Sequence, residues 1–409
     1  MRVVVLGAGF AGLMAADRIA RSGQQPVVLE ARHRVGGRVW SQQLIPGDER
    51  TVVERGAEFV LDGYDVMRSK LAEFGLALAD TTMSYHAREP RGGAPTTLAD
   101  VAACAKAIEA AASAAGPGTS LADLLKSQAL QPIAGPALDA YVARVTTTHG
   151  VPADVLSTAA LADATDGFDA KPSWRVAGGN QQLATRLADR LGSAVSLNCP
   201  ARMIEHDAAG VRVLTDDGEV PADAAIIAVP MAILRNLLFR PPLPDRYRAA
   251  WHRAGIAHNA KLHLPLAKPA KASAVQSAAE PFWTWTATDG SGEVQPVLHA
   301  FAGTERCLSG LDVARGPATW AERAGALRPE LAVDPTRALL TTWNDDPWAG
   351  ESYSALTTSA AAGDDEVVAT SAGRVHFAGE HTAGAWSGLM EGALRSGIRA
   401  ADEVLALGR

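Results

Sequence analysis

The fold is indicated by a stretch near the N-terminus that reads Gly7-Ala8-Gly9-Phe10-Ala11-Gly12. An apolar strand pattern, Arg2 to Leu6, precedes it, and a helical pattern follows it to about Ser22. A turn of this kind lets the backbone approach a pyrophosphate closely, and the amide groups at the start of the helix point at those phosphates. The alternative, that the glycines only permit tight packing of helix on strand, would explain Gly12 but not Gly7 or Gly9.

A carboxylate completes the fingerprint of a dinucleotide-binding unit. The second strand of the pattern runs from Pro26 to Glu30, so Glu30 stands eighteen positions beyond Gly12. A carboxylate at the end of that strand can accept hydrogen bonds from ribose hydroxyls. Strand, turn, helix and strand in this order predict a βαβ unit that binds a dinucleotide.

The residues after Glu30 favour a flavin over a nicotinamide cofactor. They read Ala31-Arg32-His33-Arg34-Val35-Gly36-Gly37-Arg38. The two glycines admit a second close approach of the backbone, and Arg38 offers a planar fork for phosphate or flavin oxygens. The alternative for Arg32 and Arg34 is a solvated turn.

Nearly the whole chain resembles the flavin-containing amine oxidase family, which includes monoamine, polyamine and L-amino acid oxidases. The resemblance begins with the N-terminal fingerprint and continues in further motifs that occur in one order. These are Gly56-Ala57-Glu58-Phe59, Gly178-Gly179 before a helix, Ala228-Val229-Pro230, Phe377-Ala378-Gly379-Glu380-His381-Thr382, and the run from Trp386 to Gly397. Chance agreement of several ordered motifs is very improbable.

The resemblance implies an α/β fold with a Rossmann-like FAD-binding domain and a mixed α+β substrate domain. The FAD-binding domain is expected to be assembled from residues 1–59, 175–250 and 341–409. The substrate domain is expected to take residues 60–174 and 251–340. The pattern from about Val66 to Leu161 is mainly helical. The breaker-rich run at 89–95 predicts a loop.

The resemblance also implies which residues hold the cofactor. Glu380 matches the acidic residue on the ribityl or phosphate side of FAD, with a helix-capping acid as the alternative. The amide of Met390, near the start of the last helix, would face the flavin pyrimidine oxygen. The other expected contacts are Gly7, Gly9, Gly12, Glu30, Arg32, Gly37, Arg38, Gly56 and Gly379. Because Ser352 stands where some members carry a cysteine bonded to the flavin, non-covalent FAD is predicted.

Two residues are expected to be catalytic. Lys261 aligns with the lysine that holds a water against flavin N5 in this family; the alternative is a lysine on an exposed strand edge, because burial strips an ammonium of its hydration. Tyr353 matches one of two aromatic walls that flank the amine in front of the flavin. The second wall is here Leu389, which argues against a simple preference for primary arylalkylamines. The remaining candidates for the pocket are Trp386 and Gly179, and more loosely Trp283, Trp285 and His299.

These features predict an FAD-dependent oxidation of an amine or amino acid to an imine, with O2 reoxidising the cofactor to give hydrogen peroxide. Lys261 and Tyr353 favour amine chemistry over a desaturase or protoporphyrinogen-oxidase-like reaction. A flavin-binding scaffold without catalysis is a further alternative. Arg144 and Arg175 are candidates to bind a substrate carboxylate.

Composition disfavours several other classes. The chain has 38 basic and 45 acidic residues without a run of five or six like charges, so no nucleic-acid partner is expected. Cys104, Cys199 and Cys307 are too far apart in sequence for a redox pair or metal site, and reduced thiols are expected. Neither a signal-peptide pattern nor an apolar run of membrane-spanning length is evident, which predicts a cytoplasmic location without a membrane anchor.

Overall fold

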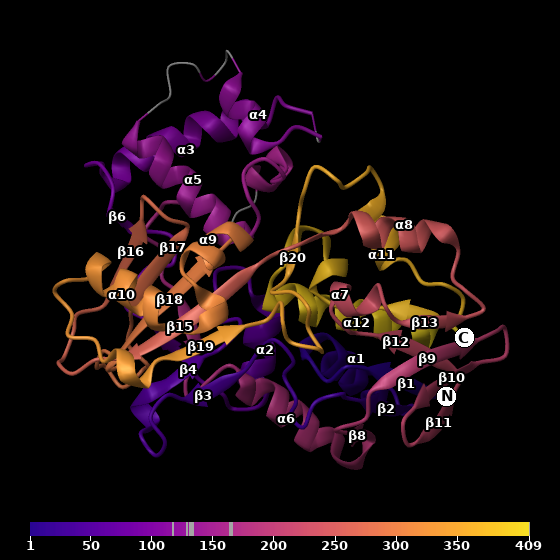
Figure 1. Ribbon diagram of the computed structural model, residues 1–409. Coiled ribbons are helices and arrows are strands. Elements are labelled where there is room, and N and C mark those ends of the chain that lie inside the picture. The colour runs from indigo at the N-terminus through magenta and orange to yellow at the C-terminus, as the bar shows by residue number, and fades with distance from the viewer. Residues whose placement is uncertain (117, 128–129, 131–134, 163–166, 409) are drawn as a thin grey trace.

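The computed structural model describes residues 1–116, 118–127, 130, 135–162 and 167–408. A five-stranded parallel sheet brings distant parts of the chain together (Figure 1). β1 (Arg2–Leu6) lies between β2 (Gln25–Leu29) and β12 (Ala224–Ile227). The outer strands are β8 (Val195–Ser196) beside β2 and β21 (Val375–Phe377) beside β12. The α/β fold predicted from the N-terminal fingerprint is confirmed.

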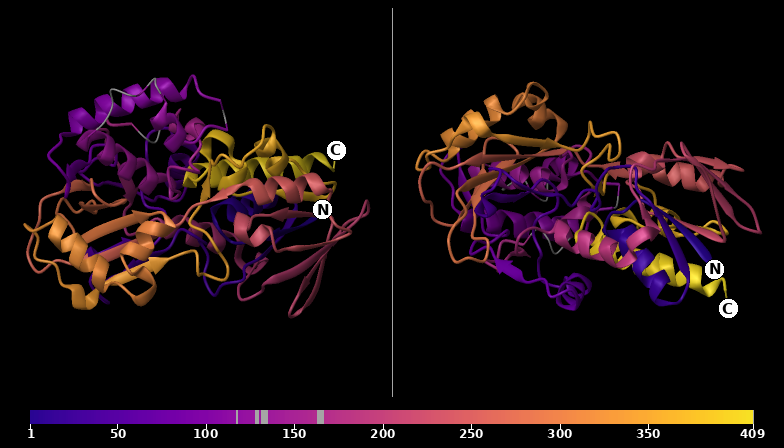
Figure 2. Two further views of the ribbon diagram at one scale, coloured as in Figure 1. Left: turned by 45° about the horizontal axis from the view of Figure 1, so that its top comes forward. Right: turned by 90° about the horizontal axis from the view of Figure 1, so that it is seen from below.

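Two helices from opposite ends of the chain pack together on this sheet. α1 (Phe10–Arg21) begins directly after the glycine turn, and α12 (Met390–Ala406) lies against it. A Cβ atom at Gly397 would lie 2.3 Å from the backbone oxygen of Ala11, so only a glycine permits this approach. As a result, the N- and C-termini lie near each other at the same end of the molecule (Figure 2).

The other face of the parallel sheet is covered by a four-stranded sheet and short helices. The strands, in spatial order, are β11 (Gly218–Ala222), β10 (Val211–Thr215), β9 (Ala201–His206) and β13 (Leu238–Arg240). The helices α8 (Asp245–Arg253) and α11 (Asp364–Ala369) pack beside each other and complete this layer. The parallel sheet is therefore buried on both faces, which explains its continuous apolar strands.

A second, six-stranded sheet faces the first domain across the molecule (Figures 1 and 2). Its strands in spatial order are β19 (Leu339–Thr342), β15 (Asn259–Pro265), β18 (Val297–Gly303), β17 (Phe282–Thr286), β16 (Ser273–Ser277) and β6 (Glu89–Arg91). The helices α9 (Glu305–Gly310) and α10 (Ala318–Leu327) cover its outer face with a shared apolar core. The opposite, inner face carries Lys261, Phe301 and Trp283, which are paired directly across three strands.

The stretch predicted to be mainly helical contains α2 (Asp65–Glu73), α3 (Leu98–Ala112), α4 (Leu121–Lys126) and α5 (Pro136–His149). Its residues 117, 128–129 and 131–134 lie outside the described part of the chain. The prediction of a loop at 89–95 is wrong for its first three residues, because they form β6 (Glu89–Arg91), which pairs with β16. A proline is tolerated there because β6 is an edge strand, where a missing amide hydrogen breaks no ladder.

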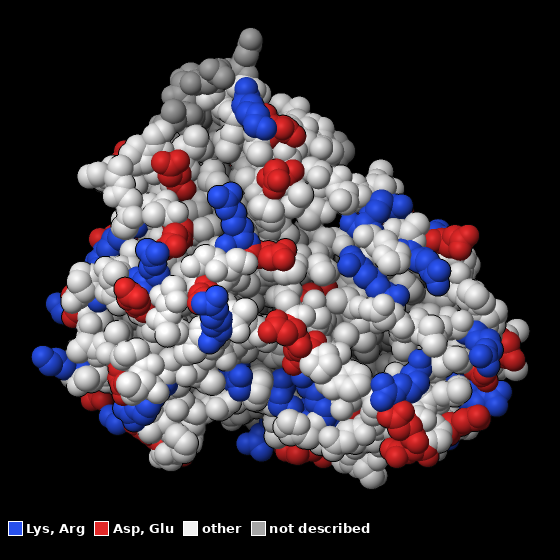
Figure 3. All heavy atoms as spheres, in the orientation of Figure 1, with Lys and Arg blue, Asp and Glu red and all other residues white. Residues whose placement is uncertain are grey.

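The remaining strands and α-helices are short except for α6, which packs against α1. They are β3 (Ser41–Gln43), β4 (Val52–Glu54), β5 (Leu78–Asp80), β7 (Trp174–Val176), α6 (Gln181–Leu191), α7 (Met231–Leu234), β14 (Gly255–Ile256) and β20 (Ser354–Ala355). In the described part of the chain, no helix has both the length and the apolar character needed to cross a membrane. On the face shown in Figure 3, acidic and basic side chains are interspersed over most of the surface.

The domain boundaries stay a proposal. All strands of the parallel sheet fall within the segments predicted for the FAD-binding domain, and β6 and β15 to β18 fall within those predicted for the substrate domain. The boundary predicted at 341 falls inside β19, which pairs with β15. We propose that the second sheet ends with β19.

Replacing Gly397 by Ala should lower the free energy of unfolding by about 1–3 kcal/mol, because the added methyl group meets backbone rather than a movable side chain. Gly310→Ala in α9 is the matched control, since a Cβ there meets nothing within 4 Å. Urea denaturation of both variants measures the difference. Equal stabilities would contradict the close packing of α12 on α1.

Candidate active site

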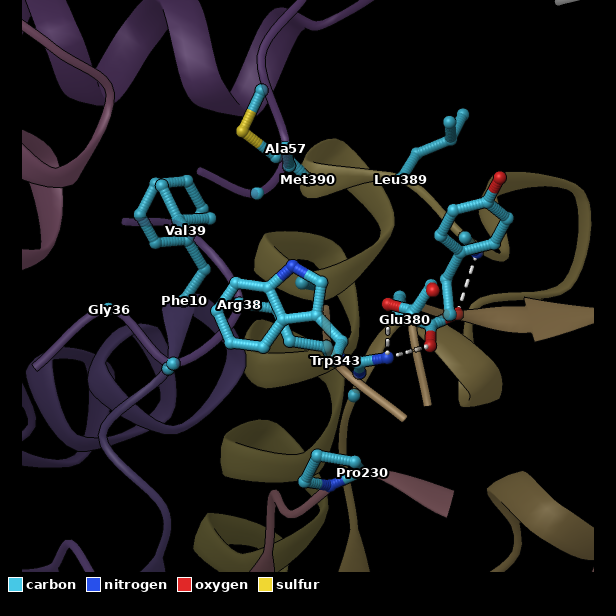
Figure 4. A pocket seen from close by; sticks show the side chains of 18 of the residues that line it. Phe10, Gly36, Arg38, Val39, Ala57, Pro230, Trp343, Glu380, Leu389 and Met390 are labelled. Carbon is cyan, nitrogen blue, oxygen red and sulfur yellow. Dashed lines mark hydrogen bonds and ion pairs between the residues drawn. The ribbon is translucent and has the colours of Figure 1, made fainter. Parts of the chain in front are cut away.

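A cavity of about 350 Å³ is lined by both ends of the chain and by the inner face of the second sheet. We call its two parts the nucleotide end and the sheet end. The nucleotide end is lined by Gly7, Gly9, Glu30, Arg32, Gly37, Arg38 and Glu380. The sheet end is lined by Phe59, Tyr85, Lys261, Trp283, Trp285, Phe301, Tyr353 and Leu389. Figure 4 shows Arg38 beside Glu380, with Met390 and Leu389 above them in the view.

The glycine turn forms a cradle at the nucleotide end. A Cβ at Gly7, whose φ is 98°, would lie 2.8 Å from the oxygen of Ala228, and one at Gly12 would lie 1.9 Å from the oxygen of Gly7. In contrast, a Cβ at Gly9 would meet nothing within 4 Å, so this side of the turn is open. No side chain caps α1, whose first amides are therefore available to an anion. This geometry fits a pyrophosphate.

Glu30 joins the turn to the loop after β2. Its Oε2 accepts a hydrogen bond from the amide of Ala8 at 2.7 Å, and its Oε1 accepts one from the amide of Arg32 at 2.8 Å. Burial raises the pKa of the Glu30 carboxyl. A carboxylate has about four acceptor positions, so two remain for ribose hydroxyls.

Arg32 makes a two-pronged ion pair with Asp346, at 2.7 and 2.6 Å. Its guanidinium therefore links the loop after β2 to the segment that follows β19. The solvated-turn alternative is wrong for Arg32, whose side chain is only 12% exposed. Arg34 stacks on Trp40, with its guanidinium carbon 4.2 Å from the ring centroid.

Arg38 connects three segments at the centre of the cavity (Figure 4). Its Nη1 lies 3.1 Å from Glu380, 3.3 Å from Glu351 and 3.0 Å from the backbone oxygen of Ser352. Burial raises the pKa of the Glu351 carboxyl to about 7. For Glu380, burial opposes the charge, but Arg38 together with the hydrogen bonds from Ser354 and Gly388 and the nearby His381 holds the pKa of that carboxyl below its usual range.

Glycines allow the segments around Arg38 to cross. A Cβ at Gly56 would lie 1.8 Å from the oxygen of Arg38. Gly37 has φ 58°, and Gly379, directly before Glu380, has φ 133°. Met390 is the first residue of α12, so its amide lies at the positive end of that helix, as the sequence predicts.

Lys261 projects from β15 into the sheet end, where it is paired with an acidic residue that sequence reasoning did not select. Its Nζ donates to Glu58 Oε2 at 2.6 Å and to the backbone oxygen of Glu54 at 3.1 Å. Lys261 is 7% exposed, which excludes the exposed-edge alternative. Glu58 was recognisable only as part of the motif that begins at Gly56.

Glu58 is held by more than Lys261. Its Oε1 accepts a hydrogen bond from Trp285 Nε1 at 3.2 Å and lies 3.6 Å from Arg175 Nη1. Burial disfavours its charge, but Lys261 and Arg175 hold the pKa of the Glu58 carboxyl below its usual range. Two cations thus share the buried Glu58 carboxylate: Lys261, which lines the sheet end, and Arg175, which lies outside the lining.

The two arginines considered for a substrate carboxylate are used elsewhere. Arg175 donates to the backbone oxygen of Thr288 and to the side chain of Gln295 as well as facing Glu58. Arg144 donates to backbone oxygens of residues 86 and 167. Both lie outside the cavity lining.

The walls of the sheet end are aromatic except at Lys261 and Leu389. Tyr353 lies beside Leu389 and donates its hydroxyl to the backbone oxygen of Thr148, the penultimate residue of α5, at 2.5 Å. Trp283 and Trp285 stack with their centroids 4.2 Å apart. His299 stacks behind Trp285 and is itself outside the lining.

Two predicted pocket residues lie elsewhere. Gly179 lies outside the lining, because it supports the start of α6, where a Cβ would be 2.5 Å from the Ser41 side chain. Trp386 is also outside the lining and packs edge-on against Tyr64, with ring centroids 6.0 Å apart. The sequence predicted both residues in the pocket, but they pack against other residues outside the lining.

Comparison with known proteins agrees with this geometry. The model of the flavin containing amine oxidoreductase family matches residues 10–405. The chain belongs to this family. It is therefore an FAD-dependent oxidoreductase that acts on amines. The cradle at Gly9, the carboxylate of Glu30 and the open α1 terminus are suited to hold FAD.

Individual relatives cover almost the whole chain. A Mycobacterium tuberculosis protein with the provisional name flavin-containing monoamine oxidase AofH is 31% identical over 99% of this chain and 96% of its own length. The nicotine dehydrogenase of Pseudomonas putida is 24% identical over 99% of this chain and 88% of its own.

Solved structures share the fold. Putrescine oxidase bound to putrescine superposes with a TM-score of 0.81 at 22% identity, covering 99% of each chain. Cyclohexylamine oxidase from Brevibacterium oxydans gives a TM-score of 0.83 at 21% identity, covering 100% of this chain and 99% of its own.

Removing the charge of Glu58 should destabilise the protein, because Lys261 and Arg175 would then face each other without an anion. We expect Glu58→Gln to lower the free energy of unfolding at pH 7 by about 3–5 kcal/mol. Because the pKa of the Glu58 carboxyl is lowered in the folded protein, the wild type should lose this contribution as the pH falls below 4.5.

The double variant Glu58→Gln/Lys261→Met is the matched control for Glu58→Gln, since it removes one of the two unpaired cations. It should be more stable than Glu58→Gln alone, as measured by urea denaturation. Additive losses in the double-mutant cycle would show that the two side chains do not interact.

Acid precipitation should release all of the flavin from the protein, because Ser352 offers a hydroxyl rather than a thiol for a covalent link. Its Oγ is bound to the backbone of Asn259, accepting from the amide at 2.9 Å. Yellow colour that stays in the washed, denatured pellet would contradict non-covalent binding.

Proposed function

We propose that the protein oxidises the carbon–nitrogen bond of an amine and that molecular oxygen is the final acceptor. FAD, when bound, accepts the hydride from the carbon that bears the nitrogen. The nitrogen loses a proton, leaving an imine, and water converts the imine to a carbonyl compound and ammonia or a smaller amine. O2 takes up the two electrons and two protons and becomes hydrogen peroxide. A cytoplasmic location is part of the proposal.

The observation that carries this proposal is the buried Lys261 in the same cavity as the nucleotide cradle. Its ammonium is fixed by Glu58 and by the backbone oxygen of Glu54. Burying a lysine ammonium costs free energy unless it has hydrogen-bonding partners, and these two acceptors supply them. We propose that it holds a water beside the cofactor, as the family resemblance implies.

The walls at the sheet end favour the neutral form of an amine. Apolar and aromatic surroundings penalise an ammonium that lacks a counter-ion, so a substrate releases its proton on entry. Tyr353 and Leu389 both line the sheet end, and contact with their side chains would orient the carbon–nitrogen bond. The first amides of α12, at Met390, supply the positive helix end for negative charge on the reduced cofactor.

The charges of the lining favour an amine over an amino acid. Among the described lining residues, the cations at or near the sheet end are already engaged. Lys261 is paired with Glu58, Arg38 lies between Glu351 and Glu380, and Arg55 stacks on Trp40 and donates to Thr341. A substrate carboxylate would therefore enter without a partner, which is unfavourable.

An anaerobic panel of amines and amino acids tests the proposal. We expect aromatic and alicyclic monoamines to bleach the flavin absorbance, α-amino acids to leave it unchanged, and readmitted air to restore it with release of peroxide. A flavin that dithionite bleaches but no nitrogen compound does would contradict amine oxidation. Bleaching without peroxide on reoxidation would exclude O2 as the acceptor.

Lys261→Met should keep the flavin bound but slow turnover by about 10²-fold, by analogy with the loss of one preorganised donor from an active site. Stopped-flow absorbance measures flavin reduction and reoxidation separately. Lys70→Met is the matched control, because Lys70 is also buried and paired, with Asp17, but lies outside the cavity. It should cost stability and leave both rates per bound flavin unchanged; unchanged rates in Lys261→Met would refute the role of Lys261.

A further inference from the structure

The carboxylate of Glu380 is saturated by donors of the chain itself. Its Oε1 accepts the amide of Ser354 at 3.1 Å and lies 3.1 Å from Arg38 Nη1. Its Oε2 accepts the Ser354 hydroxyl at 2.6 Å and the amide of Gly388 at 2.7 Å. A carboxylate has about four acceptor positions, so the four contacts leave none for a hydroxyl of the cofactor.

The donors to Glu380 stand beside the two walls of the substrate position. Ser354 directly follows Tyr353, and Gly388 directly precedes Leu389. The two wall segments also touch, since a Cβ at Gly388 would lie 3.7 Å from the Tyr353 ring. Glu380 therefore holds the backbone next to both walls at one point.

Two further contacts hold Tyr353 to other parts of the chain. Its backbone oxygen accepts the amide of Ala257 at 2.9 Å, and its hydroxyl reaches Thr148 on α5. Neither contact involves the segment that carries Leu389. The Glu380 carboxylate, by contrast, bonds to both wall segments.

We propose that Glu380 is a positioning residue that sets the spacing between Tyr353 and Leu389, and hence which amines fit. Its partner Arg38 links the nucleotide end to these walls, because Arg38 also donates to the backbone oxygen of Ser352, the residue before Tyr353. This role goes beyond the family resemblance, which assigns Glu380 to the cofactor. The substrate part of the inference rests on the proposed amine oxidation.

Ser354→Ala tests the proposal without touching a predicted cofactor residue. It removes the hydroxyl donor at 2.6 Å and keeps the amide, Arg38 and Gly388 in place. With the amine that bleaches the wild-type flavin fastest, we expect KM to rise about tenfold, as for loss of a hydrogen bond to a charged group. The values of kcat and flavin content should stay within twofold of wild type.

Ser277→Ala is the matched control. Ser277 is also buried, and its hydroxyl oxygen accepts one backbone amide, that of Glu280 at 3.1 Å, away from the cavity. If the Ser354 hydroxyl had only a structural role, both serine variants would be less stable and KM would be unchanged in both. A KM unchanged in Ser354→Ala would overturn the proposal.

Glu380→Gln gives a second test, because the amide NH2 would face a donor of Ser354 or Gly388 whichever way it turns. We expect hydrogen exchange of the FAD-bound protein to speed up in peptides that contain Ser354 and Gly388, in both Glu380→Gln and Ser354→Ala but not in Ser277→Ala. Loss of FAD from Glu380→Gln, with normal exchange and normal KM in the fraction that keeps FAD, would overturn the proposal and restore the cofactor role.

The exchange experiment needs no substrate and so separates the two hypotheses. If no amine bleaches the wild type, the proposed function fails and takes the effect on KM with it. Faster exchange in both variants would still show that Glu380 holds the two wall segments, whereas unchanged exchange would refute the positioning role by itself.

Discussion

The structure of the site depends on the contact of Arg38 with Glu380 and Glu351. Arg38 precedes both glutamates by more than three hundred positions in the chain, yet its Nη1 lies within 3.3 Å of a carboxylate oxygen of each. Buried ionic groups are tolerated only when their partners are in place, so the convergence of the two chain ends and the formation of this cluster require each other. The nucleotide cradle and the substrate walls are joined through it.

A second charged cluster sets the chemistry of the sheet end. Glu58 balances Lys261 and Arg175, and Trp285 donates to the same carboxylate. Burial strengthens the interactions among these charges, because their surroundings have a lower dielectric than water. The carboxyl of Glu54 interacts with the same cluster, and burial raises its pKa to about 7.

The departures from the family pattern are confined to the substrate side. Leu389 replaces an aromatic wall, but Phe59, Tyr85, Trp283 and Phe301 keep the rest of the chamber aromatic. The relatives named for nicotine and amines share the framework, and the fold alone is shared with putrescine and cyclohexylamine oxidases. Under the proposal for Glu380, substrate selection would depend on wall spacing as well as on wall composition.

Local sequence determined the βαβ unit and its cradle. A turn with positive φ at Gly7 and a close approach at Gly12 accept no side chain, so glycine itself marks these positions. Tertiary structure alone decided that Lys261 pairs with Glu58 and that Glu380 binds Ser354 and Gly388. Those contacts join segments that are separated in the sequence, whereas the hydrophobic periodicity of a sequence reports only on residues close together along the chain. For the same reason Gly179, Trp386 and the edge strand β6 differ from their predictions: strand pairing and helix packing across the molecule placed them.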